Sequence, residues 1–376
     1  MSIEVMELEN FLSFEHVRVE LGKLNILVGP NASGKSNFVK ALMFLSRLVK
    51  GDISLASDYL GLTFKEIVHN FDLSKEVKFH VELNVGEDHL TYEVAMRNKA
   101  ILREALVQED GTILMKRAKK KWSYVTAAME RAVPSPRELL RGLSPIQTAL
   151  AYCVSKGNAH PLLLKTKQVI EGICAYSFEA GRIRSRASTG HSLRLERDGS
   201  NLAQVLFSLL TSDRKRFFAI EEELKSLIPE VEELDVPTTE DGGETYIALR
   251  ERGISEPLRY PNISDGTLRL LAFITAIHLG GSLVAFEEPE NCVHPYLFQA
   301  LIEICRRGPS QVVITTHSPY LVDKAAPEEL LLVVKREGRS MIRRLTEKEK
   351  ATVKKMLEEG FTLGELWYMG EFGDEP

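Results

Sequence analysis

Between positions 29 and 36 the chain reads Gly29-Pro30-Asn31-Ala32-Ser33-Gly34-Lys35-Ser36. This stretch is a complete G-x-x-x-x-G-K-[ST] phosphate loop, whose glycines let backbone N–H groups close around a phosphate. An apolar run at 24–28 precedes it and indicates a buried parallel strand. Apolar residues at helical spacing follow it and predict a helix over 35–49. Strand, glycine loop and helix in this order predict a site for a nucleoside triphosphate with Mg2+.

The residues expected to touch the nucleotide belong to the loop and the first helical turn. They are Gly29, Pro30, Asn31, Ala32, Ser33, Gly34, Lys35, Ser36 and Asn37. Lys35 is expected to reach the β- and γ-phosphates, and the Ser36 hydroxyl to ligate Mg2+. The helix N-terminus adds a partial positive charge. The alternative is a glycine turn before an amphipathic helix, with no ligand.

A second candidate group follows the apolar strand expected at 282–286. The sequence there continues Glu287-Glu288-Pro289-Glu290. Glu287 is placed to hold Mg2+, and Glu288 to polarise a water molecule for attack on the γ-phosphate. Another strand, at 311–315, leads to His317, which we expect to contact the γ-phosphate or to order the attacking water. An acidic turn without a ligand is the alternative reading.

A third group opens the helix expected at 264–279. It reads Ser264-Asp265-Gly266. Ser264 is a good N-cap residue, and the helix start offers free N–H groups and a positive dipole. Because the chain already has one phosphate loop, a second anion-binding helix start suggests that this motif binds the nucleotide of a second copy in a dimer. An ordinary N-cap is the alternative.

Composition bounds the class of protein. The chain has 376 residues, 44% of them hydrophobic and 27% charged, which is enough for a large core in one big domain or two lobes. The net charge of −5 argues against a general attraction to nucleic acid. Four cysteines without a C-x-x-C pair predict neither disulfides nor a zinc site and fit a reducing cytoplasm. We expect no signal peptide and no membrane span.

The pattern of elements predicts an α/β protein. Residues 77–126 alternate as an antiparallel β meander. Residues 137–228 read as mostly helical, with a possible strand at 174–179. The last third alternates helices and strands, which implies a parallel sheet. The expected parts are 1–130 with the phosphate loop and meander, 131–230 as a mostly helical insertion, and 231–376 with the serine motif, the carboxylates and the histidine.

The order of these motifs resembles that of the ABC-type ATPase heads of the RecF, SMC and OLD group, most of all its short predicted AAA-family ATPases without a coiled coil. Three further segments share the resemblance: Glu9-Asn10-Phe11-Leu12-Ser13-Phe14, Asp198-Gly199-Ser200-Asn201-Leu202 and Leu363-Gly364-Glu365-Leu366-Trp367. The resemblance implies a two-lobed P-loop ATPase head, with an antiparallel β meander in lobe I and a helical insertion. The 59 residues after His317 are too few for the TOPRIM domain of OLD nucleases.

The resemblance also implies an ATP-dependent homodimer that sandwiches two ATP molecules. Each ATP would contact the phosphate loop, Glu287, Glu288 and His317 of one subunit and Ser264 to Gly266 of the other. The chain departs from the family at two positions: Glu287 stands where many ABC proteins have Asp, and Asp265 replaces the first Gly of the usual signature. The glutamine that usually lines the metal is not located, although His69 and Asn70 lie in a plausible region.

Two basic clusters are candidate contacts for double-stranded DNA. They comprise Lys116, Arg117, Lys119, Lys120 and Lys121, and Arg182, Arg184 and Arg186 with Arg194 and Arg197. Charge runs also serve as plain solvated faces. The first functional expectation is a cytoplasmic ATPase whose head dimerisation acts on DNA in repair, chromosome maintenance or mobile-element defence. The alternative is an ATP-gated scaffold for a separate nuclease or toxin. The unusual signature disfavours a transporter subunit.

Overall fold

The computed structural model of the protein describes residues 1–376 except 119–120, 125–132, 135–142, 158, 292 and 373–376. The chain forms two compact units. Unit 1 contains Met1–Ile173, Glu328–Ala351 and the C-terminal stretch from Phe372, and unit 2 contains Cys174–Pro327 and Thr352–Glu371. The three-part division predicted at residues 130 and 230 follows the motifs rather than these units, and it stays a prediction.

Unit 1 is built on an eight-stranded antiparallel sheet with the strand order β2-β1-β4-β5-β6-β7-β8-β9. The strands are β1 (Ser2–Phe11), β2 (Phe14–Glu20), β4 (Val77–Val85), β5 (Asp88–Arg97), β6 (Ala100–Gln108), β7 (Ile113–Ala118), β8 (Lys121–Tyr124) and β9 (Val133–Pro134). Along β4, Val77, Phe79 and Val81 are buried while Lys78 and His80 are half-buried, as expected for a sheet with one covered face. Strands β4 to β8 confirm the predicted meander.

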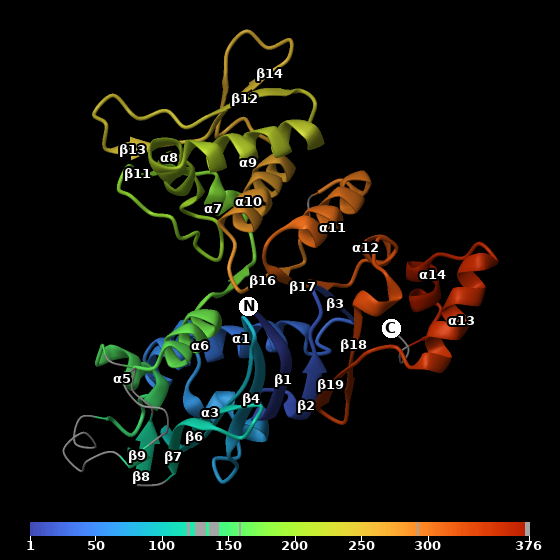
Figure 1. Ribbon diagram of the computed structural model, residues 1–376. Helices are drawn as coiled ribbons and strands as arrows, with labels where there is room; N and C mark the ends of the chain where they lie inside the picture. The colour runs from blue at the N-terminus through green and yellow to red at the C-terminus, as the bar shows by residue number, and fades with distance from the viewer. Residues whose placement is uncertain (119–120, 125–132, 135–142, 158, 292, 373–376) are drawn as a thin grey trace. The chain divides into compact units, whose positions relative to one another are not determined.

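Helix α1 (Lys35–Lys50) packs on the apolar face of this sheet (Figure 1). Phe44 of α1 lies 5.4 Å from Phe11 of β1 and 5.7 Å from Phe79 of β4, measured between ring centroids. Each such aromatic pair contributes about 0.5–1.5 kcal/mol beyond its buried area. The other helices of unit 1 are α2 (Ile53–Leu60), α3 (Phe64–Ile67), η1 (His69–Phe71), α5 (Ala149–Ser155) and α6 (Pro161–Glu171). The aromatic packing fixes α1, and therefore the loop that precedes it.

A second group of strands in unit 1 holds the start of the phosphate loop. Strand β3 (Leu24–Val28) is fully buried and pairs in parallel with β18 (Leu330–Arg336). Strand β19 (Arg339–Arg343) runs antiparallel to β18. The predicted buried parallel strand at 24–28 is therefore confirmed. Strand β19 was not predicted from the sequence, because its flanking residues are charged and read as a turn.

Unit 2 contains the strands expected to carry the carboxylates and the histidine. Strands β16 (Leu283–Glu287) and β17 (Gln311–Thr316) are parallel, and Glu287 pairs with Thr315. Strand β10 (Ile173–Tyr176) is the neighbour of β16 at the edge of this sheet. The predicted strands at 282–286 and 311–315 are confirmed. Because their carboxyl ends lie side by side, the residues that follow them meet at one edge of the sheet.

Unit 2 also contains a set of helices. They are α7 (Ala180–Ile183), α8 (Leu202–Ser212), α9 (Arg214–Leu227), α10 (Asp265–Leu279), η2 (Pro295–Leu297), α11 (Phe298–Arg307), α12 (Pro319–Val322) and α14 (Leu363–Tyr368). Phe286 of β16 packs on Phe273 of α10, with ring centroids 4.2 Å apart. Two elements near the boundaries between the units are η3 (Pro327–Glu329) and α13 (Glu347–Glu358). Helix α13 was missed by the sequence reading because Val353 is its one buried residue, which leaves no apolar period to detect.

Short strands make up the rest of unit 2. A three-stranded sheet contains β12 (Val231–Asp235), β14 (Ala248–Glu251) and β15 (Leu258–Arg259), and a ribbon joins β11 (Ala187–Ser188) to β13 (Glu244–Thr245). The sequence predicted a mostly helical region over 137–228. This is wrong for 184–201, which holds β11 and otherwise irregular backbone. That irregular segment reaches the tip of β16, as described below.

Candidate nucleotide site

The phosphate loop connects β3 to α1 in unit 1, and close packing of its backbone requires its two glycines. A Cβ atom on Gly29 would stand 2.1 Å from the carbonyl oxygen of Val333. Gly34 has φ +120, and a Cβ there would stand 2.4 Å from the Ser340 hydroxyl. L-residues with side chains rarely adopt this φ. The glycines of the motif therefore fix the path of the loop against β18 and β19.

The N-terminus of α1 has the features of an anion site. Gly34 stands at its N-cap, so no side chain caps the helix, and the first turn contains no acidic residue. Lys35 is buried, and its Nζ donates to the carbonyl oxygens of Gly29 at 2.6 Å and Pro30 at 3.0 Å. Free helix N–H groups next to a lysine favour a phosphate. Ser36 is exposed, whereas Asn37 donates from Nδ2 to the Ser13 hydroxyl at 2.8 Å.

Two serines that the sequence analysis did not single out as site residues support the loop. The Ser340 hydroxyl on β19 lies 2.6 Å from the carbonyl oxygen of Ser33 and 2.7 Å from the Ser13 hydroxyl. Ser340 is buried. No local pattern could have found it, because Ser340 lies about 300 residues after the loop and on a strand that the sequence did not predict.

The carboxylates of unit 2 lie at the tip of β16, and Glu288 stands in a strained backbone conformation. Its φ is +47, in the left-handed region, which costs a residue with a side chain about 1–3 kcal/mol. Its N–H donates to the carbonyl oxygen of Thr315 at 2.9 Å. Its carboxylate lies 3.1 Å from His317 Nδ1 and accepts from Asn291 Nδ2 at 2.9 Å. Strain at a strand end is typical of a functional position.

Glu290 is a further carboxyl at this tip, and it lies inside the protein. Its side chain is bonded to the Thr316 hydroxyl, and burial raises the pKa of its carboxyl above the ordinary value. Its Oε2 is buried and has no hydrogen-bond partner among the residues that the structure describes. The contact between Glu290 and Thr316 therefore connects the segment that follows β16 to the end of β17.

Arg197 contacts Glu287, which is a contact that the sequence reading missed. Its guanidinium Nη2 donates to Glu287 Oε1. Arg197 belongs to the basic stretch considered for DNA, and it directly precedes the Asp198-Gly199-Ser200-Asn201-Leu202 segment that shares the family resemblance, but neither signal pointed to Glu287. The predicted metal carboxylate is therefore engaged by a cation of its own chain.

The signature motif opens α10, as predicted, but its acidic residue has a partner. Ser264 is the N-cap, and its hydroxyl accepts from the N–H of Thr267 at 3.0 Å. Asp265 is bonded to Arg184, which also donates to the carbonyl oxygen of Ile263 at 2.7 Å. Ser264 and Asp265 are both exposed, and Gly266 is half-buried. The motif thus presents a serine and a charge-paired aspartate on the surface of unit 2.

Most of the described basic residues proposed for DNA are engaged within the chain. Arg117 is buried and donates to the carbonyl oxygens of Gln147 and Pro145. Arg184 holds the signature motif, and Arg186 lies 3.4 Å from Glu244. Arg182 is exposed and lies 3.9 Å from Asp198, and Lys116 is exposed on β7. Lys119 and Lys120 lie outside the described residues, as does the side chain of Lys121.

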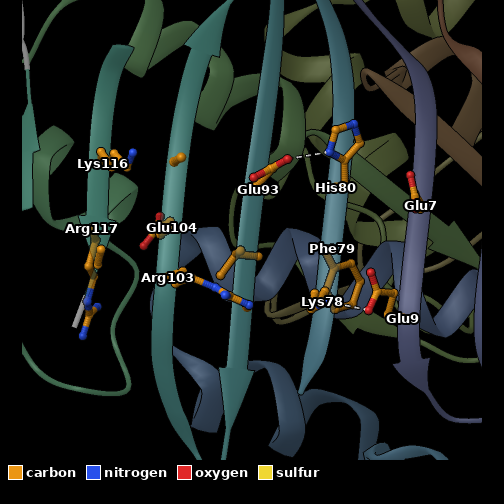
Figure 2. Close-up of a pocket in the computed structure, with 14 residues that line it drawn as sticks. Glu7, Glu9, Lys78, Phe79, His80, Glu93, Arg103, Glu104, Lys116 and Arg117 are labelled. Atoms are coloured by element: carbon orange, nitrogen blue, oxygen red, sulfur yellow. Dashed lines mark hydrogen bonds and ion pairs between the residues drawn. The ribbon is translucent and has the colours of Figure 1, made fainter. Parts of the chain in front are cut away.

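A cavity of about 450 Å3 in unit 1 is a different kind of site (Figure 2). It lies against β1, β4, β5, β6 and β7 and is lined by both acidic and basic residues. The charges pair across the strands, as Lys78 with Glu9 at 2.7 Å and His80 with Glu93 at 2.9 Å (Figure 2). Buried Glu104 accepts from the backbone of α5. This cavity lacks a glycine loop and an excess of positive charge, so it does not fit a triphosphate.

Two family models match the chain over separate ranges. A family described as "AAA ATPase domain" matches residues 1–130, which include the phosphate loop. A family described as "AAA domain, putative AbiEii toxin, Type IV TA system" matches residues 174–323, which include the signature motif, the carboxylates and His317. A search of curated protein sequences found no match.

Solved structures of SMC heads are similar along nearly the whole chain. An SMC head bound to the C-winged helix domain of ScpA matches with a TM-score of 0.58 at 14% identity, covering 93% of this chain and 99% of that one. The chain has the fold of an ABC-type ATPase head. An Smc head with an extended coiled coil from Pyrococcus furiosus, bound to the C-terminal domain of ScpA, matches with a TM-score of 0.51 at 17% identity. The match covers 95% of this chain and 99% of that one. The SMC head domain from Thermotoga maritima matches with a TM-score of 0.50 at 12% identity, covering 92% of this chain and 100% of that one.

The predicted RecF-, SMC- and OLD-like head is thus confirmed as a fold, and the family matches support an ATPase. The residues of this ATPase head also fit Mg2+. A hydroxyl and a carboxylate are oxygen ligands that Mg2+ uses beside phosphates, and the two predicted ligands, Ser36 and Glu287, are of these types. Glu287 keeps a second carboxylate oxygen beyond the one that Arg197 contacts. No helix of the described residues is long and apolar enough to cross a membrane.

Proposed function

We propose that this ATPase head binds ATP with Mg2+ and hydrolyses it to ADP and phosphate. The observation that supports this most is the start of α1, where a glycine N-cap leaves the helix N–H groups without a side-chain cap and Lys35 is buried among the loop carbonyls. A phosphate would give these donors an acceptor, and Lys35 Nζ would turn from the carbonyls to the β- and γ-phosphates.

The two units contribute different roles in this proposal. Ser36 and Glu287 would hold Mg2+, which would supply positive charge against the β- and γ-phosphates. Glu288 accepts a proton from the water that attacks the γ-phosphorus, and the bond to the ADP oxygen breaks. His317, 3.1 Å from Glu288, orients that carboxylate and the water. The order of the motifs along the chain supports their assignment to one nucleotide site.

We propose further that ATP binding joins two copies of the chain. Ser264 to Gly266 of each copy would contact the nucleotide of the other. Exposure of Ser264 at the N-terminus of α10 supports this role, because an exposed hydroxyl and helix N–H groups suit a phosphate. The contact between Arg184 and Asp265 also matters here, since it offsets the negative charge that Asp265 brings to this helix start.

The dimer would act on double-stranded DNA, through the exposed basic residues. Arg182 and Lys116 are exposed among the described residues. Lys119, Lys120 and Lys121 remain candidates from the sequence alone. Nonspecific binding through so few described cations would be weak, and its salt dependence would be shallow, because the slope scales with the number of neutralised phosphates.

The alternative is an ATP-gated scaffold that holds or releases a separate nuclease or toxin. Two observations favour it. Arg117, Arg184 and Arg186 are engaged with partners in the chain, which lowers the charge offered to DNA. Two of the similar SMC heads are described as bound to parts of ScpA, so a head of this fold can bind a separate protein.

The test is steady-state ATP hydrolysis by the purified protein, with and without linear duplex DNA at moderate salt. Lys35→Ala is the negative variant, and Lys40→Ala on the same helix is its matched control. We expect turnover that Lys35→Ala abolishes and Lys40→Ala retains. Stimulation by DNA supports the first function, and turnover indifferent to DNA supports the scaffold. Turnover that survives Lys35→Ala would overturn the proposed ATPase.

A further inference from the structure

The ion pair between Arg197 and Glu287 has no part in the proposed chemistry, yet it involves the carboxylate assigned to Mg2+. The Glu287 side chain is 12% exposed, and that of Arg197 is 38% exposed. A guanidinium that contacts this carboxylate puts a positive charge next to the place where the cation would bind. The two positive groups repel each other at such short range. Arg197 and a divalent cation therefore compete for Glu287.

The backbone around Arg197 is fixed, so that only its side chain is free to move. The carbonyl oxygen of Arg197 accepts from the N–H of Ser177 at 2.9 Å. Asn201 Oδ1 accepts from the N–H of Glu196 at 2.8 Å. Gly199 has φ +80, and a Cβ on it would stand 2.7 Å from Cγ1 of Ile183. These contacts hold the backbone of the loop in place, whereas the long side chain of Arg197 is partly exposed.

A second set of acidic partners is available to the Arg197 guanidinium besides Glu287. An open cavity of about 580 Å3 in unit 2 is lined by Arg197 itself and by three carboxylate residues, Glu179, Glu196 and Asp198. Glu179 and Glu196 are exposed. In its present position Arg197 keeps Nε buried with no hydrogen-bond partner among the described residues. Leaving Glu287 would give that N–H access to water and the guanidinium new acidic partners.

We propose that Arg197 is a two-position switch on the metal site. It occupies Glu287 in the nucleotide-free protein, and it moves to the carboxylates of Glu179, Glu196 and Asp198 when Mg2+ arrives with the nucleotide. The inference rests on the proposed function, because it takes Glu287 as the metal carboxylate. Its consequence is that the head binds ATP first through the phosphate loop and gains the metal only by displacing Arg197.

The experiment measures binding of a fluorescent mant derivative of the non-hydrolysable analogue AMP-PNP, first in EDTA and then at rising free Mg2+. Arg197→Gln removes the competing charge. We expect it to bind the analogue in EDTA as well as the wild type does. We expect the Mg2+-dependent gain to reach its midpoint at a free Mg2+ concentration about tenfold lower, as when a competing state that holds about nine-tenths of the molecules is removed.

Two controls keep the result specific to the switch. Arg194→Gln removes an exposed arginine of the same loop and is expected to leave the midpoint unchanged. The double variant Glu179→Gln/Glu196→Gln removes two exposed charges from the second position and is expected to raise the midpoint, because the displaced guanidinium loses its acidic partners. Both positions are solvent-exposed, so neither variant threatens the fold.

Three results would overturn the switch. An unchanged midpoint in Arg197→Gln means that Arg197 does not compete with the cation. A raised midpoint means that it supports Glu287 as a metal ligand. Weaker binding in EDTA means that it touches the nucleotide. Failure of the proposed function looks different: the folded wild type would then bind no analogue in EDTA or in Mg2+, and Lys35→Ala would change nothing.

Discussion

The phosphate loop of unit 1 and the strand tip of unit 2 are held in place by different forces. The loop follows a path that only glycine allows at Gly29 and Gly34, and the buried Ser340 hydroxyl supports it. At the tip, Arg197 contacts Glu287, His317 contacts Glu288, and the Thr316 hydroxyl contacts Glu290. Backbone and buried hydroxyls set the first region, and exchangeable contacts between side chains set the second.

This difference separates binding from chemistry. A loop fixed by backbone packing is already shaped for phosphate before ATP arrives, so little ordering cost remains at binding. In the proposed mechanism Glu287 exchanges Arg197 for the metal, whereas Glu288 keeps its contact with His317 while it activates water. Changes in the loop should therefore act on affinity, and changes at the tip should act on turnover. The following predictions test that separation.

The largest effect is expected at the tip. Glu288→Gln should lower ATP turnover by about 10²–10⁴-fold, because the amide cannot accept the proton of the attacking water. Binding of mant-ATP should stay within a factor of about two of the wild type, since Glu288 is not part of the phosphate loop. Glu240→Gln, an exposed glutamate of unit 2, is the matched control. Unaltered turnover in Glu288→Gln would remove Glu288 as the base.

The next largest effect is expected in the loop. Gly29→Ala would place a Cβ 2.1 Å from the backbone oxygen of Val333, so the loop must shift. We expect mant-ATP affinity to fall by about 100-fold, the equivalent of losing one or two hydrogen bonds to a charged phosphate. Gly181→Ala, where an added Cβ meets nothing within 4 Å, is the control. Normal affinity in Gly29→Ala would contradict a loop shaped by backbone packing.

A smaller effect is expected where β19 supports the loop. Ser340→Ala removes a buried hydroxyl next to the carbonyl oxygen of Ser33. Leaving that group without its partner should cost about 1–3 kcal/mol of unfolding free energy, measured by urea denaturation. Mant-ATP affinity should fall less than in Gly29→Ala. Ser54→Ala, an exposed serine of α2, should leave both quantities unchanged. A stable Ser340→Ala protein with no affinity would instead point to a direct role in binding.

The smallest effect, on the free energy of unfolding, is expected at the partly exposed ion pair between Arg343 and Glu349. Arg343 contacts Glu349 with two bonds of 2.8 Å and, with Thr346, lowers the pKa of the Glu349 carboxyl to about 2, from an ordinary 4.5. Since the pKa is lowered on folding, the pair stabilises above about pH 4.5 and loses its effect as the pH falls toward 2.

Glu349→Gln should therefore cost less than about 1 kcal/mol of unfolding free energy at pH 7, because the pair is partly solvated. The difference from the wild type should shrink in urea titrations between pH 4.5 and pH 3. Glu358→Gln, an exposed residue of the same helix, is the control. A difference that grows on acidification would contradict the assigned direction of the pKa shift.

The sequence predicted the parts of the site that depend on local chemistry. The strand before the phosphate loop, the helix after it and the helix that Ser264 caps all appear where the pattern placed them. The sequence analysis failed for segments whose buried residues do not recur at helix or strand spacing. Helix α13 buries a single side chain, and segment 184–201 carries three arginines that contact carboxylates far along the chain. Of the basic residues proposed as DNA contacts, most of those that the structure describes are paired within the chain.

By itself the sequence determined the class of site, because a glycine loop before a helix and a carboxylate pair after a buried strand are short-range patterns with one chemical meaning. Only the tertiary structure decided which charges are free. Arg117 is buried, Arg184 holds Asp265, and Arg197 occupies Glu287. Whether a charged side chain meets solvent or a partner depends on contacts between residues 80 or 90 positions apart, and such contacts leave no periodic signal in the sequence.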